Sequence, residues 1–196
     1  MAVDRTRVSE LVRELLEAIG EDPERPGLKL TPQRVADAYA EFFSGVGEDA
    51  AAPLAHTISV ARGPAPDTLP SGAVMLRDIR FRSVCEHHLL PFAGHAHVAY
   101  LPGEQVVGLG ALPKVIDILA ARPQVQERLG EQIADTIAGS IDTRGVLVVL
   151  DAVHECVTMR GGRQPSASTV TIAARGVFTE AAERAEALAL LTGGRT

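Results

Sequence analysis

The two cysteines of the chain each stand close to histidine in the sequence. Cys85 and His88 are three residues apart, with His87 between them, in the stretch CEHHLLPFAGH. Cys156 follows His154 by two residues in the stretch HECVTMRGGR. Thiolate and imidazole are the ligands that zinc favours. The sequence therefore predicts one Zn²⁺ site that is built from two distant segments.

The type of zinc site is left open by spacing alone. A closed structural site would use both cysteines together with His88 and His154, whereas an open site would use three protein ligands and a water molecule. In an open site the metal would activate that water as a nucleophile, and His87 and His154 would remain to move protons. A buried thiol without metal is the simpler interpretation of either cysteine taken singly. The zinc nucleobase deaminases do not match, because their H-x-E and P-C-x-x-C motifs are missing.

Composition narrows the class of protein. A net charge of -6 argues against general affinity for nucleic acid, because a polyanion needs a clustered cationic surface. The first 20 residues hold no continuous apolar block, so we expect neither a secretory signal nor a membrane partner. We therefore expect a cytoplasmic protein with no nucleic-acid partner, whose two cysteines do not form a structural disulfide.

The elements that position the candidate ligands follow from hydrophobic periodicity. Apolar residues at three- and four-residue steps predict two N-terminal helices, at residues 8–19 and 32–43. The later elements are two strands, two helices and two more strands. In chain order they lie at residues 74–84, 94–102, 111–122, 123–140, 145–159 and 168–178. The last strand pair carries His154 and Cys156 on one strand, where residues two apart share a face.

This order of elements predicts an α+β fold. We expect a four-stranded antiparallel sheet with two helices packed on one face, and an uncovered second face that needs a partner. Residues 48–72 are rich in Ala, Pro and Gly without periodicity, which is typical of a connector. We therefore divide the chain into an N-terminal helical segment (1–47), the connector (48–72) and a main α+β domain (73–196).

Several long motifs, in unbroken order, resemble those of GTP cyclohydrolase I. They are CEHHLLPFAGHAHVAYLP, RPQVQERLGEQIA, AVHECVTMRGGRQPSASTVT and RGVF, and they span about residues 73–180. The stretch GLKLTPQRVADAYAEFFSG is similar to the N-terminal helical segment of that family. The resemblance implies the T-fold, in which subunits complete a barrel in a ring. It also implies self-association as a homo-oligomer, typically a decamer of two stacked pentamers.

The resemblance further implies an open zinc site held by Cys85, His88 and Cys156. Its water would attack C8 of the guanine of GTP, the imidazole ring would open, and formate would leave. The ribose would then rearrange to give 7,8-dihydroneopterin triphosphate, the first step of tetrahydrofolate biosynthesis. His87 and His154 match the catalytic histidines that exchange protons with the substrate.

The substrate-binding residues implied by the resemblance lie in three stretches. Glu127, with Gln126 beside it, would bind guanine, because a carboxylate accepts from N1–H and the exocyclic amine together. Arg160 would bind the triphosphate through its guanidinium group, with Arg163 and Lys114 as helpers. Without the resemblance, each of these charges would be interpreted as a solvated surface side chain.

One stretch departs from the family's pattern. The chain has Gly108-Leu109-Gly110-Ala111 where the family usually has Gly-Leu-Ser-Lys, so a hydroxyl near the ribose and a cation at the triphosphate are missing. This departure favours one alternative, a divergent paralogue that acts on a differently phosphorylated purine nucleotide or serves a specialised pterin or deazapurine pathway. A second alternative is a non-catalytic, zinc-stabilised ring protein that binds a nucleotide.

Overall fold

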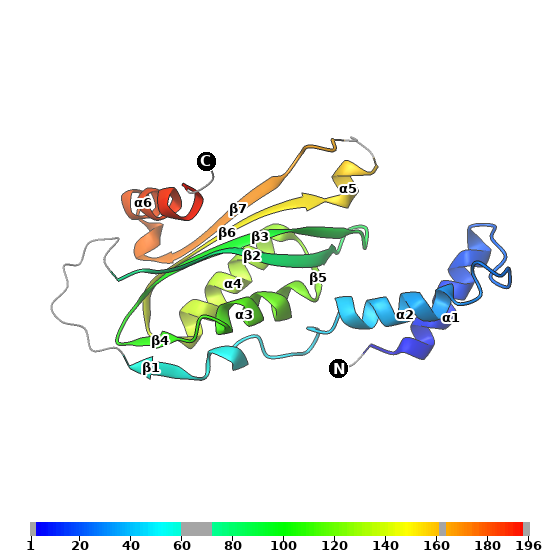
Figure 1. Cartoon of the computed structure of the whole chain (residues 1–196), viewed down its shortest axis with the longest axis horizontal. Helices are drawn as coiled ribbons and strands as arrows, with labels where there is room; N and C mark the ends of the chain where they lie inside the picture. The colour runs from blue at the N-terminus through cyan, green and yellow to red at the C-terminus, as the bar shows by residue number, and fades with distance from the viewer. Residues whose placement is uncertain (1–2, 60–71, 161–163, 194–196) are drawn as a thin grey trace. The chain divides into compact units, whose positions relative to one another are not determined.

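The structure, a computed structural model, describes residues 3–59, 72–160 and 164–193. The chain forms two compact units, one ending at Glu48 and the other beginning at Asp49. The first unit is a pair of helices that pack against each other, α1 (Arg5–Ala18) and α2 (Thr31–Phe42), as the periodicity predicted (Figure 1). The residues predicted as a connector lie partly outside the described residues, at 60–71.

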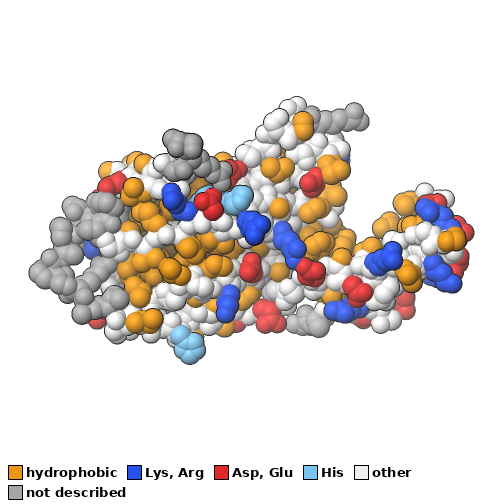
Figure 2. Space-filling model, viewed as in Figure 1, with side chains coloured by type: hydrophobic (Ala, Val, Ile, Leu, Met, Phe, Trp, Pro, Cys, Tyr) orange, Lys and Arg blue, Asp and Glu red, His pale blue; other side chains and the backbone are white. Residues whose placement is uncertain are grey.

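The helix pair has a small apolar interface and many surface charges. Asp4 caps α1, because its side chain accepts a hydrogen bond from the backbone N–H of Arg7 at 2.9 Å. Leu16 and Ala36 are buried between the helices, whereas Leu15 is 58% exposed. Figure 2 shows charged side chains of both signs over the surface of this unit. Ion pairs between such exposed side chains contribute little stability.

The second unit is built on an antiparallel sheet. Four strands follow one another in the spatial order β2 (Val74–Cys85), β3 (Pro91–Pro102), β6 (Thr143–His154) and β7 (Thr169–Gly176). A two-residue strand, β5 (Pro123–Gln124), adds to the outer edge of β2 in the parallel direction, so the sheet has five strands where four were predicted. A separate small sheet pairs β1 (Thr57–Ser59) with β4 (Gln105–Val107).

Two helices cover one face of the large sheet, α3 (Ala111–Ala120) and α4 (Gln126–Ser140) (Figure 1). The main core lies between them and the sheet, and a short 3₁₀ helix, η1 (Ala52–Leu54), closes it beside α3. The largest fully buried side chains of this core are Leu54, Phe92, Tyr100, Leu112, Ile116, Leu129, Ile133, Ile137 and Leu150. The predicted α+β arrangement with two helices on one face is confirmed.

A further helix, which the sequence did not predict, lies on the opposite face of the sheet. It is α6 (Ala181–Thr192), and it follows a 3₁₀ turn, η2 (Val177–Thr179). Leu191 and Phe178 pack there against Leu101 and Leu147, whose side chains point away from the main core. The stretch AAERAEALALLT spreads alanine and leucine around the helix, so it shows no clear apolar stripe. In the described part of the chain, none of the helices is long and apolar enough to cross a membrane.

Candidate metal centre and catalytic site

The first segment of the candidate metal site is the tight turn that joins β2 to β3. The backbone N–H of Cys85 donates to the carbonyl oxygen of Leu90 at 2.8 Å, and the N–H of Leu89 donates back to the oxygen of Cys85 at 2.8 Å. Leu89 adopts a φ of 52°, a conformation that costs an L-residue roughly 1–2 kcal/mol. The N–H of Glu86 also donates to the oxygen of Gln124 at 2.9 Å, which ties the turn to β5.

The second segment is the end of β6. A strand was predicted through residue 159, but β6 ends at His154 and a short helix, α5 (Glu155–Thr158), begins at once. The N–H of Met159 donates to the oxygen of Glu155 at 3.0 Å, and the hydroxyl of Thr158 donates to the oxygen of His154 at 3.2 Å. His154 and Cys156 therefore do not share a strand face, and their side chains have different partners.

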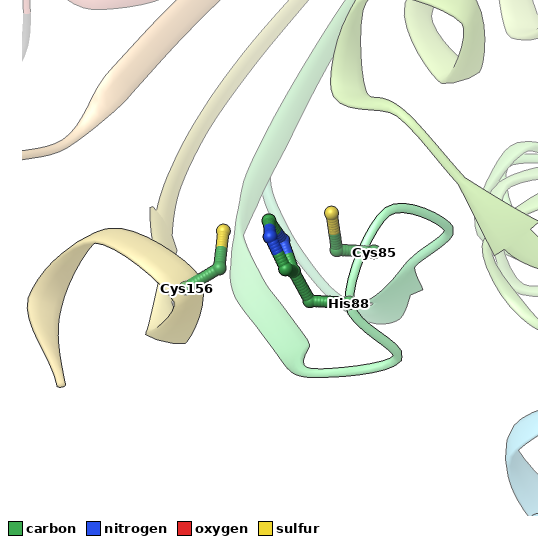
Figure 3. Close-up of side chains that lie close together, drawn as sticks. All are labelled: Cys85, His88 and Cys156. Atoms are coloured by element: carbon green, nitrogen blue, oxygen red, sulfur yellow. The ribbon is translucent and has the colours of Figure 1, made fainter. Parts of the chain in front are cut away.

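Three side chains from these segments converge on one point (Figure 3). The Sγ atoms of Cys85 and Cys156 and a ring nitrogen of His88 all lie within 4.8 Å of one another. Ligands of a tetrahedral zinc ion stand roughly 3.5–4 Å apart, so small side-chain movements suffice to bind one. The donor set of two thiols and one imidazole is also the one that zinc prefers. Among the described residues, His154 is not part of this cluster.

The cluster is buried on one side and open on the other. Cys85 is 5% exposed and belongs to the main core, Cys156 is half-buried, and His88 is exposed. Burial raises the pKa of the Cys156 thiol, the neighbouring Cys85 raises it further, and the positive charge of Arg160 opposes the rise. A thiol in this state binds a metal by releasing its proton, and the charge of a divalent cation favours that release.

The His154 ring is held by two contacts. It lies flat on the ring of Phe92, with centroids 4.5 Å apart and planes 5° apart, because the two residues face each other across the β3–β6 ladder. Its Nε2 atom lies 2.7 Å from Oε1 of Gln126. Burial lowers the pKa of His154, and the nearby Glu127 carboxylate opposes the shift. The neutral form of the ring is therefore favoured near pH 7.

The start of α4 carries two of the predicted substrate-binding residues in different environments. Glu127 is exposed in the first helical turn, where the helix dipole favours a negative charge. Gln126 is only 1% exposed, and both ends of its amide are hydrogen-bonded inside the protein. This burial differs from the direct substrate contact expected of Gln126. Adjacent residues at the start of a helix point in different directions, which sequence spacing does not resolve.

The remaining predicted residues lie on the outside of the unit. Arg160 is exposed and close enough to Cys156 to act on its pKa, and Lys114 is exposed on α3. His87 is exposed, with its ring centroid 6.3 Å from that of His88. Arg163 lies outside the described residues.

A contact that sequence analysis missed joins the β2–β3 turn to α4. The guanidinium of Arg128 forms an ion pair with the carboxylate of Glu86 and donates from Nε to Oε1 of Gln124 at 3.3 Å. Arg128 lowers the pKa of the Glu86 carboxyl through this hydrogen bond. The two residues are 42 positions apart, and no local pattern links them. Phe92 was missed for the same reason, because its partner is set by strand register.

Comparison with known proteins extends the likeness beyond these motifs. The chain matches the family described as GTP cyclohydrolase I over residues 8–192. It is 62% identical over 191 residues to the GTP cyclohydrolase 1 of Leifsonia xyli subsp. xyli (strain CTCB07), with 97% of each chain covered. It is 50% identical over 188 residues to the GTP cyclohydrolase 1 of Bacillus subtilis (strain 168), with 95% of each covered. The matched residues include both halves of the metal cluster and the start of α4, and the chain belongs to the GTP cyclohydrolase I family.

Proposed function

We propose that this GTP cyclohydrolase I works with a zinc ion held by Cys85, His88 and Cys156. The observation that carries the proposal is the convergence of two thiols and one imidazole within 4.8 Å, on a cluster that is open on one side. A zinc ion there would supply a Lewis acid that makes water nucleophilic near neutral pH. Because His154 is bonded to Gln126, three protein ligands remain, which is typical of catalytic zinc sites.

The two histidines outside the cluster are proposed to move protons. The reaction opens the imidazole ring of the guanine of GTP, releases formate and yields 7,8-dihydroneopterin triphosphate, so protons must be delivered and removed at several atoms. Imidazole suits this task because it titrates near neutral pH. His154 can accept a proton because its lowered pKa keeps it neutral. His87 lies beside the proposed ligand His88 and is exposed.

The substrate is proposed to bind between α4 and the end of β6. The exposed carboxylate of Glu127 can accept two hydrogen bonds from the edge of guanine. Arg160 carries its charge near Cys156, where it can bind a phosphate oxygen of the triphosphate. Lys114 and Arg163 are proposed to assist it.

The start of α3 offers a test of triphosphate binding. Gly110 precedes α3, and Ala111 is the first residue of the helix. The space around this turn is open, because a Cβ atom at Gly110 would meet nothing within 4 Å. A cation at position 111 would restore the lysine of the family pattern. We expect Ala111→Lys to lower the KM for GTP by about tenfold, the value of one charge-assisted hydrogen bond. Steady-state kinetics with GTP and GMP check this, and an equal change for GMP would contradict it.

The assembly is proposed to be a decamer of two pentameric rings. In the sheet order, β7 is an edge strand, and its side chains Val170 and Ile172 are 58% and 47% exposed. Such an edge is a template for pairing with a strand of another subunit. Native mass spectrometry of the full chain tests this, with a single ten-chain species expected and a monomer or dimer as the contrary result.

We propose the cytoplasm as the location of the protein, because thiol ligands stay reduced there. Cell fractionation tests this.

The reaction itself is tested with zinc-loaded protein and three substrates, GTP, GDP and GMP. Formate release and the fluorescence of the oxidised pterin are measured together. We expect both products from GTP and much slower turnover of the shorter nucleotides. Protein treated with a chelator and then reloaded with zinc is the matched control, and it should lose and regain activity. Formate without pterin, or no turnover of any nucleotide, would contradict the proposal.

A further inference from the structure

Gln126 is a buried polar side chain whose contacts determine how its amide is oriented. Its Nε2 atom lies 3.1 Å from the carbonyl oxygen of Leu150 and 2.8 Å from that of Thr169. It also lies 3.2 Å from Oγ1 of Thr171. A carbonyl oxygen can only accept a hydrogen bond, so the end of the amide that faces two of them must be the NH₂ group. The other end, Oε1, is therefore the one that faces His154.

This orientation fixes the proton on one nitrogen of His154. The amide oxygen of Gln126 is only an acceptor, so Nε2 of His154, 2.7 Å away, must be the donor. A neutral imidazole carries its proton on one nitrogen and a lone pair on the other. With Nε2 protonated, Nδ1 is the nitrogen that can take up a proton.

We propose that Gln126 is a positioning residue that holds neutral His154 in the tautomer protonated at Nε2, so that Nδ1 exchanges protons with the substrate. This inference rests on the proposed proton role of His154. Stacking on Phe92 keeps the ring plane fixed, so the Gln126 bond selects the tautomer without rotating the ring. Gln126 thus acts on the reaction through His154, in place of a direct contact with GTP.

The position of Gln126 links two parts of the site. It precedes Glu127, the proposed guanine ligand, in the first turn of α4, and its amide also bonds to β6 and β7. The residue that reads the base and the residue that orients the histidine are therefore neighbours in one rigid element. The hydrogen bonds from Gln126 to the two strands also stabilise the fold. The test therefore measures thermal stability, the tautomer of His154 and kcat separately.

The test variant is Gln126→Met, and Gln124→Met is its matched control. Gln124 is also 1% exposed, and its amide nitrogen donates to the oxygen of Leu119 at 3.0 Å and to Oε1 of Gln132 at 2.8 Å. Both variants lose buried amide hydrogen bonds, but His154 loses its partner only in Gln126→Met. With zinc-loaded protein, we expect Gln126→Met to lower kcat about 10- to 100-fold, with the KM for GTP within about threefold. Gln124→Met should lower thermal stability similarly and keep kcat within about threefold of the wild type.

A spectroscopic measurement reads the tautomer directly. Solid-state nitrogen NMR of isotopically labelled histidine is recorded on zinc-loaded protein near pH ~8.5, where an ordinary imidazole is neutral. The His154 signal is the one that is missing from His154→Asn. We expect the wild type and Gln124→Met to show only the Nε2-protonated tautomer, and Gln126→Met to show a mixture.

Three results would overturn the inference. They are a wild-type His154 protonated at Nδ1, a tautomer unchanged in Gln126→Met, or a raised KM for GTP with an unchanged kcat. The last result would indicate direct contact with the substrate. The tautomer of wild-type His154 tests the inference even if Gln126→Met does not fold, because protonation at Nδ1 would overturn it. The NMR measurement of the tautomer does not require turnover. A wild-type protein that releases no formate from GTP would therefore contradict the proposed function and not the inference about Gln126.

Discussion

The two halves of the metal centre contain the same kinds of side chain but use them differently. The hairpin half (residues 85–90) contributes Cys85 and His88 to the cluster, while His87 stays outside it. The strand-end half (residues 154–160) contributes Cys156, while His154 is bonded to Gln126. Each half therefore places at least one side chain in the cluster and leaves one histidine outside it.

The halves also differ in how firmly they are held. The hairpin half begins in the main core at Cys85, is closed by two backbone hydrogen bonds across its turn and is tied to α4 through Arg128. The strand-end half continues into one short helical turn, and Met159 is 76% exposed. The difference teaches that the hairpin half is the more firmly held side of the candidate metal site, whereas the strand-end half is attached through β6 and one short helical turn. Three changes test this comparison.

Removal of either thiol is expected to have the largest effect. Cys85→Ser and Cys156→Ser should each weaken zinc binding by more than about a hundredfold, because a first ligand matters more than an outer partner. In metal-free protein, Cys85→Ser should cost about 1–3 kcal/mol, because it buries a hydroxyl in the core. Cys156→Ser should cost less than about 1 kcal/mol there.

Metal analysis and calorimetry of the metal-free proteins measure both effects. Stoichiometric zinc in either variant would remove that cysteine from the ligand set. Equal thermal stabilities of the two metal-free variants would show that the halves are held equally firmly.

Replacement of the two non-ligand histidines is expected to have the next largest effect. His87→Asn and His154→Asn should each lower kcat about 10²- to 10⁴-fold, the usual contribution of a general acid or base. Zinc content should remain stoichiometric in both, because neither side chain is in the cluster. Turnover is measured by formate release and zinc by metal analysis. Loss of zinc from His154→Asn would return that residue to the ligand set and make the site a closed one.

The tie between Glu86 and Arg128 should give the smallest effect, which is present near neutral pH and lost in acid. Arg128 lowers the pKa of Glu86 from its ordinary value of 4.5, so the ion pair stabilises the fold above about pH 4.5 and this contribution is lost as the pH falls through the lowered value. Arg128→Met should therefore reduce the thermal stability of metal-free protein at pH ~6, and the difference from wild type should shrink toward pH ~3.

Thermal unfolding across this pH range measures the effect. Glu86→Gln combined with Arg128→Met is the control, and it should be no less stable than Arg128→Met alone. A difference from wild type that stays constant with pH would mean that Arg128 contributes by packing and not by charge.

Much of the fold was predictable because its elements are strongly periodic. The stripe of α1 and the helix pair α3 and α4 follow from apolar spacing, and the sheet follows from strand order. The two cysteines were singled out because each has histidine nearby, whereas the set of Cys85, His88 and Cys156 was implied by the family resemblance. Their convergence is a property of the sheet, in which β2 and β6 both lie beside β3 and end near one another.

What could not be predicted depends on long-range packing. The stretch that follows His154 has the composition of a strand, yet the chain turns into α5 there, because tertiary contacts override local propensity. The burial of Gln126 depends on carbonyl groups of β6 and β7, which are 24 and 43 residues away. These carbonyl groups, and not the residue types of Gln126 and Glu127, determine which of the two side chains faces the sheet.

The pairing of Phe92 with His154 in the β3–β6 ladder makes the position of the His154 ring depend on the length of the strand. Successive residues of a strand point to opposite faces, so losing one residue from the middle of β6 would turn the His154 ring away from both Phe92 and Gln126. Substitution of that residue in the middle of β6 by an apolar residue would keep the strand register, so the His154 ring would stay in place. The register of the β3–β6 ladder therefore determines where the His154 ring lies.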